Sequence, residues 1–143
     1  MSELSVDLSG IRCAFLDLDG TIYHGRDLIP GAVDFLTRLE QKGIRRFFLS
    51  NNSSRSVEQY VGKLQGLGIP VTKDEILLST HDLIAWLAAK GITQTYLVGT
   101  EGMRSMLEFA GLSTRSDTPQ YVILGYDTEI TYDKIEMASV HLH

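Results

Sequence analysis

Two carboxylates separated by a single residue are the sharpest chemical signal in the sequence. Asp17 and Asp19 follow the mostly apolar run 11–16, and Gly20 and Thr21 come directly after them. Side chains at positions i and i+2 of an extended chain point the same way, so both carboxylates can face one reacting centre. Gly20 lets the chain turn away without a side chain crowding that centre.

A carboxylate pair of this kind suits phosphoryl transfer. One carboxylate can attack phosphorus to form an aspartyl-phosphate, while the other protonates the leaving oxygen and then deprotonates the hydrolytic water. Because two anions repel a phosphate group, the site also needs a divalent cation. An oxygen-rich site with few protein ligands and retained waters favours Mg2+.

Three other interpretations of the pair compete with phosphoryl transfer. An EF-hand loop also begins Asp-x-Asp, but it needs glycine at its sixth position and glutamate at its twelfth, where this chain has Ile22 and Leu28. A phospho-acceptor receiver domain also has an aspartate pair early in its chain. In such a domain the pair would not be followed directly by Gly-Thr-Ile, as it is here. The third alternative is a structural pair that caps a loop without catalysis.

A second polar cluster follows another apolar run. Residues 44–49 read as a strand, and Ser50, Asn51 and Asn52 begin a stretch of small hydrogen-bonding residues that leads into a helix. A hydroxyl, side-chain amides and free backbone N–H groups at a helix start can hold a phosphate. Since such clusters are usually turns or caps, this one gains its weight from its position at the carboxyl end of a strand expected beside the Asp17 strand.

Strand-like and helix-like segments alternate along the whole chain, which predicts an α/β fold with a parallel sheet covered by helices. Strands are expected at 11–16, 44–49, 95–98 and 121–125, with 11–16 and 44–49 central, and helices near 32–39, 57–64, 83–88, 103–110 and from 132 onward. Ser56 with Gln59, and Thr72 with Glu75, have the spacing of capping boxes. A domain boundary is expected near residue 79.

Composition and charge exclude several classes of protein. The net charge of -5 is spread along the chain, so no nucleic-acid surface is expected. No apolar run approaches the roughly 20 residues that span a bilayer, and the polar N-terminus lacks the form of a signal peptide, so a cytoplasmic protein is expected. Cys13, the single cysteine, excludes an internal disulfide and is expected to be a small buried hydrophobe.

Residues 17–21 (Asp-Leu-Asp-Gly-Thr) and 49–53 (Leu-Ser-Asn-Asn-Ser) together resemble the first two motifs of the haloacid dehalogenase-like (HAD) superfamily, within its NagD-like or 4-nitrophenylphosphatase-like branch. The resemblance implies that Asp17 is the nucleophile and Asp19 its acid/base partner. It also implies that Mg2+ binds the Asp17 side chain and the Asp19 backbone carbonyl. The residues that would hold the phosphate are Ser50, Asn51 and Asn52.

The same resemblance implies a Rossmann-like parallel-sheet core, of which residues 1–78 are the N-terminal part, followed by an incomplete α/β cap domain at 79–143. The family's third motif, a lysine, and its fourth, a Gly-Asp with a further acid, have no counterpart in this sequence. Lys134, the last lysine, lies in a cap-like helix. The chain is therefore interpreted as a fragment or an interrupted product. The expected turn, loop or helix-start residues are Asp127, Tyr132, His24 and His81.

Two functional hypotheses follow from these residues. In the first, the complete form of the protein is a phosphatase of a small phosphorylated metabolite. In the second, the chain is a catalytically inactive fragment that acts as a folded or dimerising module. The substrate is not specified by the sequence, because in this branch the cap selects it, and homo-oligomer formation is left open.

Overall fold

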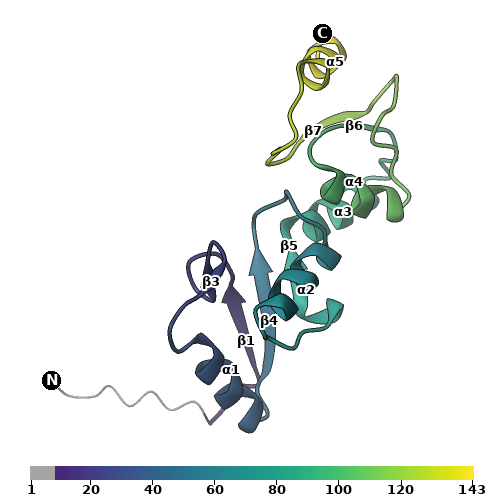
Figure 1. The fold of residues 1–143 in the computed structure, drawn as a ribbon. Coiled ribbons are helices and arrows are strands. Elements are labelled where there is room, and N and C mark those ends of the chain that lie inside the picture. The colour runs from purple at the N-terminus through teal and green to yellow at the C-terminus, as the bar shows by residue number, and fades with distance from the viewer. Residues whose placement is uncertain (1–8) are drawn as a thin grey trace, which may run out of the picture. The chain divides into compact units, whose positions relative to one another are not determined.

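The computed structural model describes residues 9–143 as an α/β chain (Figure 1). Its strands are β1 (Cys13–Asp17), β2 (Tyr23–His24), β3 (Asp27–Leu28), β4 (Arg45–Ser50), β5 (Ile76–Leu78), β6 (Thr95–Val98) and β7 (Tyr121–Leu124). Its helices are α1 (Ala32–Gln41), α2 (Val57–Gly66), the 3-10 helix η1 (Lys73–Glu75), α3 (Ser79–Ala89), α4 (Glu101–Phe109) and α5 (Tyr132–His141). The predicted α/β class is confirmed.

Internal contacts divide the chain into two units, Met1–Leu49 and Ser50–His143. The first unit holds β1 to β3, α1 and nearly all of β4, and the second holds the elements from α2 to α5. The division into a core segment 1–78 and a cap segment 79–143 stays a prediction.

The parallel pairing of β1 with β4 organises the first unit. Cys13 lies opposite Arg45 and Asp17 opposite Leu49. Among the described strands of this unit, β4 is the one that pairs with β1. β1, which was expected to be central, lies at the edge, because residues 9–143 provide no strand on its other side.

Helix α1 connects these two parallel strands. It follows Gly31, whose φ of 85° suits glycine, and it buries Ala32, Leu36 and Leu39 at helical spacing. The helical spacing of Ala32, Phe35, Leu36 and Leu39 in the sequence predicts Phe35 on the same apolar face, but Phe35 is 47% exposed.

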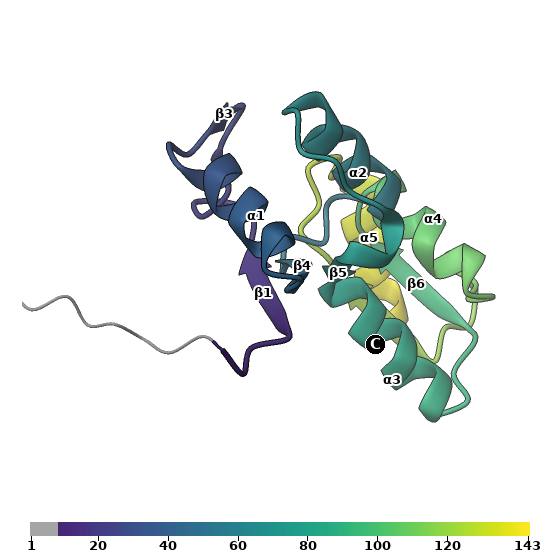
Figure 2. The same ribbon diagram turned by 90° about the horizontal axis from the view of Figure 1, so that it is seen from below.

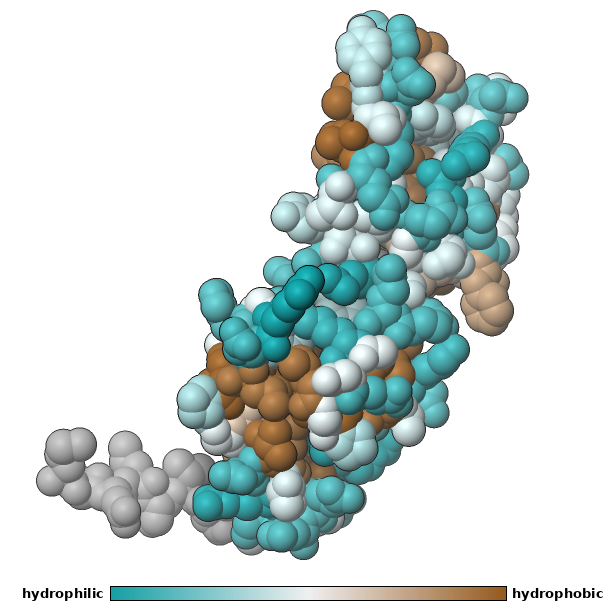
Figure 3. Space-filling model, viewed as in Figure 1, coloured by the Kyte–Doolittle hydropathy of each residue, from teal (hydrophilic) through white to brown (hydrophobic). Residues whose placement is uncertain are grey.

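One face of β1 is open to solvent. Phe15 is 58% exposed and its ring stacks on that of Phe47 with centroids 5.3 Å apart. Figure 3 shows apolar side chains gathered on the surface around β1. Cys13 shares this face and is exposed, so the expectation of a buried cysteine is wrong. The alternation of the edge strand places it on the uncovered side.

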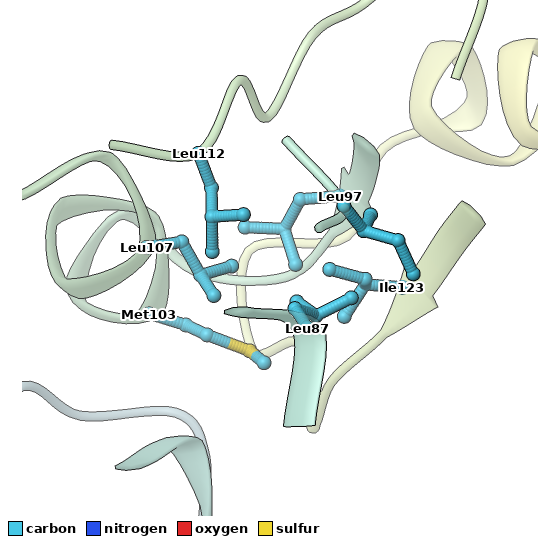
Figure 4. Close-up of a cluster of buried hydrophobic side chains, with 7 residues drawn as sticks. Leu87, Leu97, Met103, Leu107, Leu112 and Ile123 are labelled. Atoms are coloured by element: carbon cyan, nitrogen blue, oxygen red, sulfur yellow. The ribbon is translucent and has the colours of Figure 1, made fainter. Parts of the chain in front are cut away.

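The second unit has its own apolar core. β6 and β7 pair in parallel, with Thr95 opposite Tyr121 and Val98 opposite Leu124. Figure 2 shows α3 and α4 beside β6, and Figure 4 shows the side chains that fill the space between these elements. The buried cluster consists of Leu87, Ile92, Leu97, Met103, Leu107, Leu112 and Ile123. Large aliphatic side chains packed in this way contribute about 1.5–3 kcal/mol each on full burial.

Helix α5 is only partly packed. Ala138 is its buried residue, whereas Ile135 is 49% exposed and Leu142 72% exposed. The helical spacing of Ile135, Ala138 and Leu142 in the sequence predicts an apolar face on this helix. The spacing of that face is present, but most of it is uncovered in the described chain.

No helix within residues 9–143 is long and apolar enough to cross a bilayer. The interpretation of the polar N-terminus concerns mainly residues 1–8, which lie outside the described residues. The expected cytoplasmic location stays a prediction.

Candidate functional site

The carboxyl end of β1 presents the two predicted carboxylates. Asp17 is the last residue of the strand and Asp19 lies two positions on; both are exposed. Leu18 between them is fully buried at 0% exposure. This alternation turns the two carboxylates toward solvent together and anchors the backbone between them, as the i, i+2 spacing predicts.

A tight turn follows the pair. The Leu18 carbonyl accepts hydrogen bonds from the N–H groups of Thr21, Ile22 and Tyr23 at 3.3, 3.0 and 3.3 Å. Gly20 has a φ of 88°, and its N–H donates to the Tyr23 carbonyl at 2.8 Å. Glycine is the residue that adopts this conformation without strain, which explains its place directly after the second carboxylate.

Tyr23 is a site residue that the sequence did not point to. Its side chain is buried at 0% exposure, and its hydroxyl donates to Oδ2 of Asp19 at 3.3 Å. The contact orients the Asp19 carboxyl from its buried side, and Asp19 itself remains exposed. An aromatic residue four positions after the carboxylate carries no motif signal by itself, so only the fold reveals this contact.

The carboxyl end of β4 carries Ser50, which is buried at 7% exposure. Its Oγ lies 2.8 Å from the hydroxyl of Tyr60 in α2. The same Oγ accepts the N–H of Asn52 at 3.2 Å. Ser50 is therefore held from two sides within the second unit.

The loop after Ser50 is folded by its own side chains. Asn52 Oδ1 accepts the N–H of Ser54 at 2.9 Å, and Ser56 forms the predicted capping box with Gln59 at the start of α2. Free N–H groups were expected at the helix start, but the box occupies those of Ser56 and Gln59.

The remaining donors of this loop lie one turn earlier in the chain. Within residues 9–143, the N–H groups of Ser53 and Arg55 donate no hydrogen bond. Asn51 is exposed, and its carbonyl accepts the Ser79 hydroxyl at 3.3 Å. The loop therefore offers both unpaired backbone donors and side-chain amides, which is the chemistry of an anion site.

Later segments of the second unit hold this loop from behind. Ser53 Oγ accepts the N–H of Tyr126 at 2.8 Å, and the Ser54 carbonyl accepts the Thr100 hydroxyl at 2.9 Å. The approach is close. A Cβ on Gly125 would meet Ser53 Oγ at 3.2 Å, and a Cβ on Gly102 would collide with the Gln59 side chain.

The register between β1 and β4 relates the two polar segments. Asp17 lies opposite Leu49, and Ser50 is the next residue of β4. Both strands run in the same direction, so their carboxyl ends share one edge of the sheet. This confirms the predicted neighbouring of the two strands, while the catalytic and binding roles of their residues stay predictions.

The donor set at Asp17 fits magnesium only in part. Within residues 9–143 the Asp17 side chain has no hydrogen bond or ion pair, so its oxygens are available to a cation. Mg2+ commonly takes one or two protein carboxylates and keeps several waters. The described residues contain no group of three or more His, Cys, Asp or Glu side chains that could hold a metal. This chain would therefore contribute a few ligands, not a closed cage.

A family model for haloacid dehalogenase-like hydrolases matches residues 14–113, which include both polar segments. The chain belongs to this family. Its likeness to solved structures places it in the NagD or p-nitrophenylphosphatase branch, as the two motifs predict.

Several relatives of this family are similar over most of the chain. An acid sugar phosphatase of Staphylococcus aureus is 35% identical over 133 residues, which cover 90% of this chain and 51% of that protein. The crystal structure of a 4-nitrophenylphosphatase from Thermotoga maritima has a TM-score of 0.87 at 32% identity and covers 94% of this chain and 52% of its own.

A third similar structure contains a metal. The glycerol phosphate phosphatase of Mycobacterium tuberculosis, crystallised in complex with magnesium, has a TM-score of 0.81 at 28% identity and covers 92% of this chain and 41% of its own. The family therefore includes phosphatases of different small molecules. The chain spans about half the length of the curated relatives it matches.

Lys134, the last lysine, is fully engaged within the second unit. Its Nζ donates to Asp127 Oδ2 at 2.8 Å and to the carbonyls of Gly99 and Glu129, each at 2.9 Å. An ammonium has three protons, so all are used. This ties the ends of β6 and β7 to α5, and agrees with the expectation that Asp127 is a turn-forming residue. His81 caps α3 by accepting the Leu78 N–H at 3.1 Å.

Proposed function

We propose that this chain supplies the nucleophile, the acid/base group and the phosphate-holding loop of a Mg2+-dependent phosphatase of small phosphorylated metabolites. The supporting observation is the Asp17 carboxylate, which is exposed and unpaired within residues 9–143 at the end of β1, beside the strand that ends at Ser50. The similar phosphatases support the reaction class. Their names differ in substrate, so the metabolite itself is not assigned.

The proposed reaction has two steps on Asp17. In the first, a carboxylate oxygen of Asp17 attacks phosphorus, the ester P–O bond breaks, and Asp19 gives its proton to the leaving oxygen. In the second, Asp19 removes a proton from water, the water oxygen attacks the same phosphorus, and the Asp17–phosphate bond breaks. Inorganic phosphate leaves, and both carboxyl groups return to their starting protonation.

The other groups of the chain bind and orient the substrate. Ser50, Asn51 and Asn52 are proposed to donate hydrogen bonds to the phosphate oxygens. Asp17, through its side chain, and Asp19, through its backbone carbonyl, would hold Mg2+, which would offset the negative charge gathered around phosphorus. Tyr23 keeps the Asp19 carboxyl directed toward solvent through its hydrogen bond.

The 143-residue sequence contains no lysine matched to the family's third motif and no second acidic motif. Removing one group that stabilises charge in the transition state typically costs about 10^2 to 10^3 in rate. We therefore expect the 143-residue chain alone, assayed with Mg2+ and 4-nitrophenyl phosphate, to show little or no hydrolysis. If the gene encodes a longer product, we expect that product to turn over in the same assay.

Asp17→Asn provides the control for this comparison, since it changes one atom of the proposed nucleophile. Robust Mg2+-dependent turnover by the 143-residue chain, lost in Asp17→Asn, would mean that another chain or residue completes the site. Turnover by a longer product that survives Asp17→Asn would exclude Asp17 as nucleophile. Absence of turnover in every form, together with self-association, would favour the alternative of an inactive folded or dimerising module.

A further inference from the structure

Tyr60 makes a contact with the proposed phosphate loop that no motif assigns. It lies in α2 and is 1% exposed, and its hydroxyl is 2.8 Å from Ser50 Oγ. The same hydroxyl can instead donate to the Asn52 carbonyl, at 3.4 Å. Its ring belongs to the apolar face that the helical spacing of Val57, Tyr60, Val61 and Leu64 predicts for α2. Its polar end reaches the loop.

The hydrogen-bonding capacity of the Ser50 hydroxyl determines what the Tyr60 contact does. A serine hydroxyl has one proton to donate and two lone pairs that accept. The N–H of Asn52 occupies one lone pair at 3.2 Å. If Tyr60 donates to the other, Ser50 can accept no further bond, and its own proton must point to a third group. Ser50 then acts as a donor only, which is what a phosphate oxygen requires.

If Ser50 donates to Tyr60 instead, the hydrogen bonds around Ser50 are weaker in total once an anion is present. In that arrangement Ser50 donates to Tyr60, and Tyr60 donates to the Asn52 carbonyl at 3.4 Å. Hydroxyl hydrogen bonds are best near 2.7–2.8 Å, so this second bond is weak. A phosphate that accepts from Ser50 replaces it with a charge-assisted bond, which is about twice as strong as a neutral one.

We infer that Tyr60 is a positioning residue that orients the Ser50 hydroxyl as a hydrogen-bond donor toward a bound phosphate group. This rests on the proposed function, in which Ser50 holds the phosphate. Tyr60 itself does not touch the ligand. It acts by filling a lone pair of Ser50 and by fixing its side-chain rotamer from the buried side.

A double-mutant cycle tests the inference with inorganic phosphate as the probe. Phosphate affinity in the presence of Mg2+ is measured by 31P NMR titration for the unsubstituted chain, Tyr60→Phe, Ser50→Ala and the double variant. One lost hydrogen bond predicts that Tyr60→Phe weakens binding about 3- to 10-fold. In the Ser50→Ala background the same change should have no effect, because no hydroxyl is left to orient. Equal weakening in both backgrounds would overturn the inference.

A second measurement needs no ligand. The N–H of Asn52 is bonded to Ser50 Oγ, so loss of the Tyr60 hydroxyl is expected to speed amide hydrogen exchange at Asn52 several-fold. The Ser54 amide, which is bonded to Asn52 Oδ1, should change less. The matched control is Tyr96→Phe, which removes a hydroxyl that has no hydrogen bond within residues 9–143.

The two measurements separate the possible failures. Absence of phosphate binding by the unsubstituted chain would count against the proposed function. Unchanged exchange at Asn52 in Tyr60→Phe would count against the positioning role, whatever the chain binds. A Tyr60→Phe chain that unfolds can be recognised from the loss of protection in the buried cluster around Leu107.

Discussion

The carboxyl ends of β1 and β4 both carry polar residues, but these residues differ in burial and in hydrogen bonding. At the end of β1, Asp17 has no bonded partner within residues 9–143, and the Asp19 carboxyl accepts a 3.3 Å bond from Tyr23. At the end of β4, by contrast, Ser50 is buried and bonded on two sides.

This difference indicates how substitutions at the two strand ends should affect the stability of the fold. An exposed carboxylate costs little to leave unpaired because water solvates it, whereas a buried hydroxyl or amide must be satisfied. The β1 end can therefore keep a reactive group free, and the loop after β4 can be held in a fixed shape before any ligand arrives. Substitutions at the end of β1 should alter chemistry with little effect on stability, whereas substitutions around the loop after β4 should alter stability as well as ligand binding.

The largest expected effect is chemical. In whichever form of the protein hydrolyses 4-nitrophenyl phosphate, Asp17→Asn should lower kcat at least about 10^3-fold, because an amide is not a nucleophile toward phosphorus. KM should change far less, since other groups share the binding. The free energy of unfolding should stay within about 0.5 kcal/mol of the original, as expected for an exposed side chain. A large loss of stability would break the contrast between the two strand ends.

The next effect concerns the three hydrogen bonds that Lys134 donates to Asp127, Gly99 and Glu129. Replacing it by methionine leaves the Asp127 carboxylate, whose side chain is 1% exposed, without a counter-ion. Breaking a largely buried pair in this way should lower the free energy of unfolding of the second unit by about 2–4 kcal/mol, measured by urea denaturation. Lys73→Met is the control, because its partner Glu58 is exposed and the pair contributes little.

A smaller effect on stability is expected where α4 contacts the start of α2, at the end of the loop after Ser50. Gly102→Ala places a Cβ against the Gln59 side chain and 2.9 Å from the Ser56 nitrogen, which should cost about 1–3 kcal/mol in unfolding free energy. Gly62→Ala, inside α2, meets nothing within 4 Å and should instead stabilise by about 0.5–1 kcal/mol. Equal responses of the two variants would show that the loop is not held tightly from behind.

The smallest effect is a pH-dependent one at the surface. The hydrogen bond from Lys73, 2.7 Å from Glu58, lowers the pKa of the Glu58 carboxyl. A lowered pKa adds stability above the pKa of the unfolded chain, and this stability is lost as the pH falls through the folded value. Because both side chains are mostly exposed, Glu58→Gln should cost less than about 0.5 kcal/mol at neutral pH. The difference between variant and original should vanish in acid, which thermal unfolding at several pH values can check.

The sequence predicted most of the elements but not how their faces are covered. The alternating apolar runs and capping spacings specify β1, β4 and α2, because local periodicity determines them. The exposure of Cys13 and Phe35 could not be predicted, since it depends on which strands and helices lie against their faces. Periodicity gives the direction of a side chain, not its neighbour.

The site was predictable to the same extent. Asp17, Asp19 and Ser50 were identified because carboxylates and hydroxyls after an apolar strand carry a chemical meaning by themselves. Tyr23 and Tyr60 were not, because Tyr23 carries no motif signal and Tyr60 was predicted only as part of the apolar face of α2. Their hydroxyl partners became visible only when the turn after β1 and the helix after β4 were folded against them.

Two hydrogen bonds link the loop after Ser50 to the segments that follow β6 and β7, so ligand binding at the loop and formation of these bonds are thermodynamically coupled. Ser53 and Ser54 are bonded to Tyr126 and Thr100, which follow β7 and β6. A ligand whose binding depends on the shape of this loop must bind differently when those bonds are made and when they are broken. By reciprocity, the same ligand then shifts the equilibrium of the distant strand ends by an equal free energy. Occupancy of an anion site at Ser50 would thus be readable as altered hydrogen exchange at Tyr126, more than seventy positions along the chain.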